Sequence, residues 1–165
     1  MQDQTDLDEI WFVVSPQNPF KKQKTLLHEF DRLKMVELAI ADHFYFRACD
    51  VEFHMPRPSF TIDTLAVLAD KYPQHQFKLI IGGDNLTHFH KWKNHEQILE
   101  YFGLYVYPRP GSHQEFRHPN VKFVEAPLMN ISATFIRESI KNGYSVKYLL
   151  PQSVEDYIRD KKLFV

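Results

Sequence analysis

FKLIIGGD, residues Phe77–Asp84, is the stretch of sequence that decides the fold class. The apolar run predicts a short buried strand, and Gly82-Gly83-Asp84 ends it abruptly. Continuously apolar strands of this kind are typical of parallel sheets that are covered on both faces. Glycines directly after such a strand allow a ligand to approach the backbone closely. The stretch therefore predicts a parallel sheet with a ligand site at its carboxyl edge.

Other short apolar runs alternate with amphipathic segments on both sides of this strand. We predict further strands over 10–14, 45–51, 104–107 and 121–124, and helices over 28–42, 61–72, 94–101, 132–142 and from 151. The alternation indicates an α/β fold with a doubly wound, Rossmann-like parallel sheet. The part from about residue 132 is expected to be helical, and Gly143 is expected to end the helix over 132–142.

Composition limits the class of protein. The 165 residues fit a single domain over 1–165. Lys plus Arg is 20 and Asp plus Glu is 21. This near balance of charge argues against a protein that binds nucleic acid, so we expect no nucleic-acid partner. No apolar run has membrane-spanning length, and Cys49 is the single cysteine, which fits a reducing compartment. We expect a cytoplasmic protein that binds no membrane, and the sequence leaves homo-oligomer formation open.

Polar residues follow each predicted strand, at the edge where open parallel sheets bind their ligands. The set contains glycines, hydroxyls, one carboxylate and several cations. Its segments are Ser15–Lys21, Pro56–Thr61, Gly82–Asn85, Pro108–Gly111 and Asn130–Thr134. Such a collection predicts a site for an anionic ligand that carries phosphate.

The predicted helix start at Ser132 is the most informative of these segments. Free N–H groups and the helix dipole attract phosphate there, and Ser132 and Thr134 add hydroxyl donors. Arg137 lies about one helical turn beyond Thr134, so its guanidinium can reach the same phosphate. Taken alone, the pattern fits an ordinary N-cap followed by a surface arginine somewhat better.

Two other segments also have two interpretations. The carboxylate of Asp84 is suited to accept ribose hydroxyls or to help hold a metal, but a tight turn with Asp84 as a cap fits as well. The basic run at Lys21, Lys22 and Lys24 is suited to contact phosphate, although charge runs are usually solvated faces.

Three histidines, His88, His90 and His95, lie close together in the sequence, as metal ligands often do. Cations surround them, no nearby carboxylate supports them and the spacing is not H-E-x-x-H. We therefore predict no metal site. Trp92, in the same stretch, is interpreted as a platform for a flat ring or as an edge residue of the core. P-loop, G-x-G-x-x-G and nucleophile-elbow motifs are absent from the sequence.

Taken together, six segments resemble the nucleotidyltransferase superfamily and, within it, the bacterial nicotinate-nucleotide adenylyltransferase family. The segments are WFVVSPQNPFK (11–21), PSFTIDTL (58–65), IIGGDNL (80–86), KW (91–92), YPRPG (107–111) and ISATFIR (131–137). The last resembles the superfamily's I-S-[SA]-T-x-[IL]-R phosphate-binding signature. The resemblance covers nearly the whole chain and has its segments in the family's order.

The resemblance implies an enzyme that transfers the adenylyl group of ATP to nicotinate mononucleotide, with Mg²⁺ bound to ATP. Its products would be nicotinate adenine dinucleotide and pyrophosphate, a step of NAD biosynthesis. The implied catalytic cations are Arg137 and Lys21. The implied ATP site comprises Ser132, Thr134, Arg137, Gly82, Gly83 and Asp84, with Asp84 near the ribose. The implied nicotinate-nucleotide site comprises Thr61, Thr64, Trp92, Lys93 and Arg109.

One diagnostic element of the superfamily does not occur in residues 1–165. It is a central N-terminal strand followed by G-G-[ST]-F-[ND]-P-x-H-x-G-H, whose histidines bind the ATP phosphates. Our hypothesis is that the chain is N-terminally truncated by about 20–25 residues, the length of one strand, a loop and one helix. Two other functions stay open: an inactive nucleotide-binding module, and a related transferase that uses nicotinamide mononucleotide or phosphopantetheine.

Overall fold

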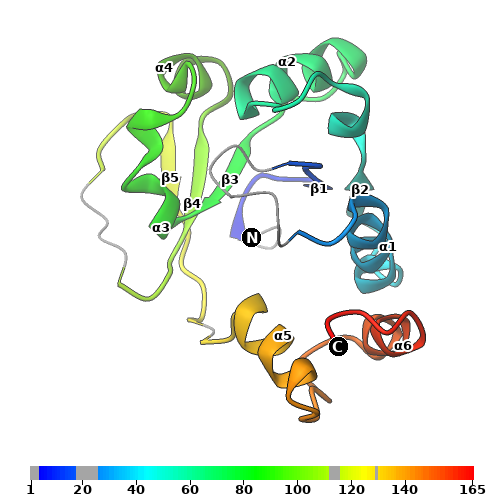
Figure 1. Ribbon diagram of the computed structural model, residues 1–165. Helices are drawn as coiled ribbons and strands as arrows, with labels where there is room; N and C mark the ends of the chain where they lie inside the picture. The colour runs from blue at the N-terminus through cyan, green and yellow to red at the C-terminus, as the bar shows by residue number, and fades with distance from the viewer. Residues whose placement is uncertain (1–3, 18–25, 112–115, 129) are drawn as a thin grey trace. The chain divides into compact units, whose positions relative to one another are not determined.

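The computed structural model describes residues 4–17, 26–111, 116–128 and 130–165 (Figure 1). The chain divides into two compact units, which are described one at a time. Unit 1 contains residues 1–8, 15–25 and 51–129, and unit 2 contains residues 9–14, 26–50 and 130–165.

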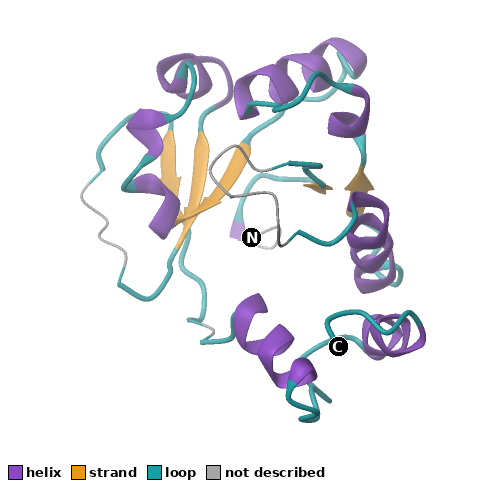
Figure 2. Ribbon diagram, in the orientation of Figure 1, coloured by secondary structure: helices purple, strands orange, loops and turns teal. Residues whose placement is uncertain are grey.

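Unit 1 is built on a three-stranded parallel sheet in the order β3-β4-β5 (Figure 2). In register, Leu79 of β3 lies beside Leu104 of β4, and Leu104 lies beside Val121 of β5. The strands are β3 (Leu79–Gly82), β4 (Leu104–Tyr107) and β5 (Val121–Phe123). The helical segments are η3 (Val51–His54), α2 (Thr61–Lys71), α3 (Gly83–Leu86), η4 (Phe89–Lys91), α4 (His95–Gln97) and η5 (Ile98–Phe102).

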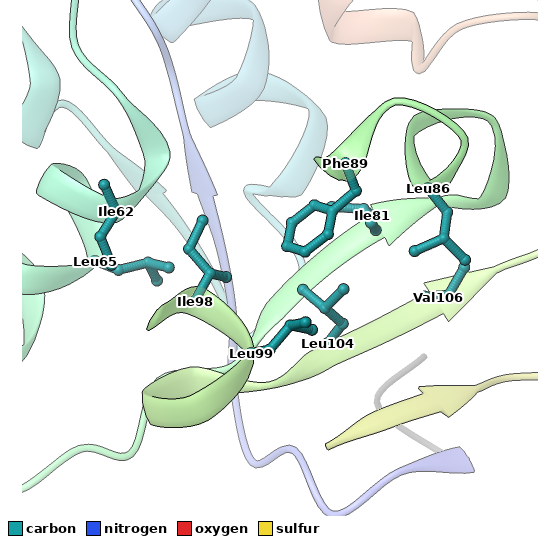
Figure 3. Packing of buried hydrophobic residues seen from close by; sticks show 9 residues of the cluster. All are labelled: Ile62, Leu65, Ile81, Leu86, Phe89, Ile98, Leu99, Leu104 and Val106. Atoms are coloured by element: carbon teal, nitrogen blue, oxygen red, sulfur yellow. The ribbon is translucent and has the colours of Figure 1, made fainter. Parts of the chain in front are cut away.

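The core of unit 1 lies between this sheet and the helices that follow the strands (Figure 3). Phe89 and Ile98 are fully buried, and Val106 of β4 is 1% exposed. Ile62 and Leu65 bring one face of α2 into the same cluster. Ile62, Leu65 and Val106 are positions that helical and strand periodicity indicate, and burial of the cluster's hydrocarbon surface holds the strand ends in place.

Unit 2 contains a parallel pair of strands, β1 (Ile10–Val13) and β2 (Phe46–Cys49), in which Ile10 lies beside Phe46. Its helices are α1 (Glu29–Ile40), α5 (Ala133–Lys141) and α6 (Gln152–Asp160). The Tyr157 hydroxyl of α6 donates to Asp31 of α1 at 2.8 Å. That hydrogen bond raises the pKa of Tyr157 above its usual value. The Ser153 hydroxyl of α6 also donates to the Leu38 carbonyl of α1 at 3.1 Å, so hydrogen bonds join α6 to α1.

The parallel α/β class predicted from the sequence is confirmed, and each predicted strand and helix is present within a few residues of its expected bounds. Gly143 follows α5 with a φ of 73°, as expected of a residue that ends a helix. The apolar run of β1 is of the kind that predicts a strand covered on both faces, and this expectation is wrong for Phe12, which is 38% exposed. Among the described strands β1 pairs only with β2, so its other edge has no neighbouring strand.

Candidate functional site

The beginning of α2 is a helix terminus whose N–H groups no side chain caps. Thr61 is the first helical residue, and the N-cap position is held by Phe60, which has no side-chain acceptor. N–H groups of a helix's first turn carry the positive end of the dipole. The backbone N–H of Thr64, one turn later, donates to the Phe60 carbonyl at 3.0 Å. The N–H groups before Thr64 are therefore the ones suited to bind an anion.

An ion pair attaches a second predicted segment to the same helix start. Nζ of Lys93 lies 3.0 Å and 2.8 Å from the two carboxylate oxygens of Asp63, in the first turn of α2. It also lies 4.9 Å from the centroid of the Phe60 ring. Trp92, beside Lys93, packs against the core with its ring centroid 5.4 Å from that of Phe89. The structure thus brings the predicted residues Thr61, Thr64, Trp92 and Lys93 onto one side of unit 1.

A buried carboxylate lies beneath this group of residues. Glu52, in η3, is 8% exposed, and it accepts hydrogen bonds from the hydroxyls of Ser15, Ser59 and Thr64. Sequence reasoning missed both Glu52 and Asp63. An acidic residue in a sequence gives no sign of its burial or of its partner, so pairing of this kind becomes visible only in the folded chain.

Four predicted residues lie together at the carboxyl end of β3. Gly82 is the last residue of β3 and Gly83 begins α3, with Asp84 in its first turn. Oδ1 of Asp84 lies 3.6 Å from Nε of Arg109, which follows β4. A Cβ atom on Gly82 would collide with Asp84 Oδ1 and would lie 3.0 Å from Arg109 Cγ. The N-cap of α3 is Gly82, so Asp84 does not have the capping role considered above.

The remaining predicted phosphate residues lie at the start of α5 in unit 2. Ser132 is the N-cap, and its Oγ accepts from the N–H of Phe135 at 3.1 Å. Nη2 of Arg137 donates to Oγ1 of Thr134 at 3.2 Å. Ser132, Thr134 and Arg137 are all exposed. Ser132 thus caps α5, and the Arg137 guanidinium lies on the surface one turn from the helix terminus.

Three further points concern Lys21, metal ligands and membrane-spanning helices. Lys21 lies outside the described residues. Within the described ranges, no group of three or more His, Cys, Asp or Glu side chains is arranged to hold a metal ion. The same ranges contain no helix that combines the length and the apolar character needed to cross a bilayer.

Comparison with known proteins places the chain in a family. The family model described as "Cytidylyltransferase-like" matches residues 1–139. A protein of Cytophaga hutchinsonii is 57% identical over 166 residues, covering 99% of this chain and 86% of its own length. It is named "Probable nicotinate-nucleotide adenylyltransferase". The chain belongs to the nicotinate-nucleotide adenylyltransferase family. Relatives with the same name in Flavobacterium johnsoniae and Bacillus licheniformis are 48% and 34% identical, and each aligns with 96% of the chain and 84% of its own length.

Solved structures show the same fold. A nicotinic acid mononucleotide adenylyltransferase of Plasmodium falciparum, complexed with NaAD, matches with a TM-score of 0.76. The match covers 96% of this chain and 83% of that one, at 18% sequence identity. A second structure of that enzyme, complexed with APC, has a TM-score of 0.75 at 17% identity. The parallel α/β architecture described above is thus the architecture of this family.

Proposed function

We propose that this protein transfers the adenylyl group of ATP to nicotinate mononucleotide, giving nicotinate adenine dinucleotide and pyrophosphate. The family supports the reaction, since relatives that match nearly the whole chain are named for it. Cys49 is the single cysteine of the sequence, which fits a reducing compartment, so we also propose a cytoplasmic location.

The proposal rests mainly on one observation: the ion pair between Lys93 and Asp63 holds the Trp92–Lys93 segment at the start of α2. The ligand implied by this arrangement is a flat ring that bears a carboxylate. The ring would stack on Trp92, and the carboxylate would accept hydrogen bonds from the uncapped N–H groups near Thr61. The cation of Lys93 lies on the same side, where Asp63 holds it. An amide accepts fewer hydrogen bonds than a carboxylate, which favours nicotinate over nicotinamide.

The start of α5 supplies the proposed ATP-phosphate residues. First-turn N–H groups, the Thr134 hydroxyl and the exposed Arg137 guanidinium would bind the phosphates, with Ser132 fixing the helix terminus. Arg137 would also stabilise charge that develops on the phosphates during transfer. We assign Lys21 the same kind of role.

The carboxyl end of β3 would bind the sugar and a phosphate. Asp84 would accept hydrogen bonds from the ribose hydroxyls. Because Gly82 has no side chain, the Asp84 carboxylate has room beside it. Arg109, which is 3.6 Å from Asp84, would contact the phosphate of the mononucleotide. A phosphate carries more charge than the half-exposed Asp84 carboxylate and so would compete for the guanidinium.

In the proposed reaction, an oxygen of the mononucleotide phosphate attacks the α-phosphorus of ATP in line. The bond from that phosphorus to the bridging oxygen breaks, and pyrophosphate leaves with the electron pair. Catalysis then consists of positioning and charge stabilisation, with no covalent enzyme intermediate. Mg²⁺ bound to the ATP phosphates would neutralise part of their charge.

An acceptor panel tests the proposal. Purified protein is incubated with MgATP and nicotinate mononucleotide, nicotinamide mononucleotide or phosphopantetheine, and pyrophosphate release is measured. We expect the highest kcat/KM with nicotinate mononucleotide. A higher kcat/KM with another acceptor would show that this acceptor, and not nicotinate mononucleotide, is the substrate. Binding of ATP in a calorimeter without pyrophosphate release from any acceptor would support an inactive nucleotide-binding module instead.

A further inference from the structure

Glu52 is a buried charged residue of unit 1 that the proposed reaction does not use. Its side chain lies in η3 and only 8% of the residue is exposed. In the described part of the chain, no Lys, Arg or His forms an ion pair with it. Burial of a carboxylate costs free energy unless hydrogen bonds replace those to water. The structural role of Glu52 therefore follows from the groups that donate hydrogen bonds to its carboxylate.

Three hydroxyls donate to the Glu52 carboxylate. Oε2 accepts from Ser15 Oγ at 2.5 Å and from Ser59 Oγ at 2.6 Å, and Oε1 accepts from Thr64 Oγ1 at 2.8 Å. The two shorter distances lie in the range of charge-assisted O–H···O⁻ bonds, which are about twice as strong as neutral ones. Ser59 and Thr64 are themselves 7% and 4% exposed. Water therefore has little access to compete for these two bonds.

The donors lie on both sides of the start of α2. Ser59 is two residues before Thr61, the first helical residue, and Thr64 is three residues after it. Two bonds to one carboxylate thus hold the chain before and after the uncapped first turn. The third donor, Ser15, ties a segment distant in sequence to the same point. The position and direction of the first-turn N–H groups consequently depend on Glu52.

We propose that Glu52 is a positioning residue for the acceptor site and that Thr64 acts through it. This inference rests on the proposed function, because it assigns the start of α2 to the carboxylate of the nicotinate nucleotide. The buried Thr64 hydroxyl donates to Glu52 Oε1 at 2.8 Å, with the Phe60 carbonyl oxygen farther away at 3.2 Å. The Thr64 N–H donates to the same Phe60 carbonyl, so Thr64 supports the site from beneath. Its predicted contact with the nucleotide is thereby replaced by an indirect role.

Three variants test the hydrogen bonds. Glu52→Gln keeps the shape but replaces one acceptor oxygen by an NH₂ group, so at least one hydroxyl loses its bond. Thr64→Val keeps the volume of the side chain and removes the hydroxyl. Thr64→Ser keeps the hydroxyl and is the conservative rescue. Ile98→Val is the control, because it removes a buried methylene group from the same core with no effect on the carboxylate.

Three measurements are made on each variant, at a temperature well below its Tm. Hydrogen exchange at the amide of residue 64 reports on the helix start without any ligand. Calorimetry gives the Kd of nicotinate mononucleotide, and kinetics gives its KM beside the KM of ATP. For Glu52→Gln and Thr64→Val we expect amide protection to fall and the Kd to rise, each roughly tenfold. The KM of ATP should change much less, and Thr64→Ser and Ile98→Val should resemble the wild type.

The outcomes separate the two proposals. Unchanged amide protection in Glu52→Gln would overturn the positioning role, whatever the ligand. Equal changes in Thr64→Val and Ile98→Val would also overturn it, because they would show a general loss of stability. If exchange responds as expected but the wild type does not bind nicotinate mononucleotide, the positioning role holds and the proposed substrate is wrong.

Discussion

Lys93 and Asp63 form an ion pair that joins the Trp92–Lys93 segment to the first turn of α2, with Nζ 2.8 Å from Oδ2. Each side chain is 43% exposed, so the pair adds little to the free energy of unfolding. Its importance is local. It fixes a cation beside the helix start that we assign to the nicotinate carboxylate, and it keeps Asp63 from repelling that carboxylate.

Lys93→Met should weaken binding of the acceptor. The substitution removes the cation and leaves the Asp63 carboxylate unpaired beside the proposed anion site, so we expect the KM of nicotinate mononucleotide to rise about three- to tenfold. Surface pairs contribute up to about 1 kcal/mol, so the Tm should change little. Lys34→Met is a matched control, because Lys34 forms an exposed pair with Glu37 at 3.2 Å in α1. Equal effects of the two substitutions on KM would contradict the assignment.

Arg137→Ala should lower kcat/KM for both substrates by about 10²–10³, the usual cost of removing a group that stabilises transition-state charge. Arg137 is exposed and donates a hydrogen bond to the hydroxyl of Thr134 on the same helix, so the Tm should stay nearly constant. Steady-state kinetics and thermal unfolding provide the measurements. Arg159→Ala, at an exposed arginine of α6, is the control. A large loss of stability in Arg137→Ala would instead support a structural role.

Substitutions of Ser132 can separate capping from phosphate binding. Asp and Asn cap helices about as well as Ser does, so Ser132→Asp and Ser132→Asn should both retain the Tm. Only Ser132→Asp adds a negative charge where the ATP phosphates would bind. We expect the KM of ATP to rise about tenfold or more in Ser132→Asp and much less in Ser132→Asn. The same KM in both variants would place the phosphates elsewhere.

Two glycines should respond differently to alanine. At Gly82 the new Cβ meets the side chains of Asp84 and Arg109, which can move away, so we expect a small loss of stability and roughly a tenfold fall in kcat/KM. At Gly103 the φ is +72° and the new Cβ would lie 2.8 Å from the Asn120 carbonyl oxygen. Gly103→Ala should therefore destabilise the protein by about 1–2 kcal/mol or more. Denaturant unfolding and kinetics on both variants make the comparison, and an inactive, equally unstable Gly82→Ala would contradict it.

Much of the local structure could be predicted because it depends on near neighbours in the chain. The apolar run of β3, the glycine that ends α5 and the Ser132 cap are local signals, and each is found where the sequence places it. Burial was harder to predict. Phe12 lies in an apolar run that has the composition of a core strand, and it is nevertheless 38% exposed. Burial depends on which other segments lie beside a strand.

The sequence by itself determined the parallel α/β class, the glycines after β3 and the family, since these depend on periodicity and on the order of motifs. Only the tertiary structure decided which side chains act together. Asp63 lies 30 positions from Lys93, and Glu52 lies 37 positions from Ser15. Such pairs form when helices and strands pack, and a hydrogen bond or ion pair depends on distances of a few ångströms that no sequence spacing specifies. The support of the proposed acceptor site, from Glu52 through Thr64 to the start of α2, is therefore a property of the folded chain.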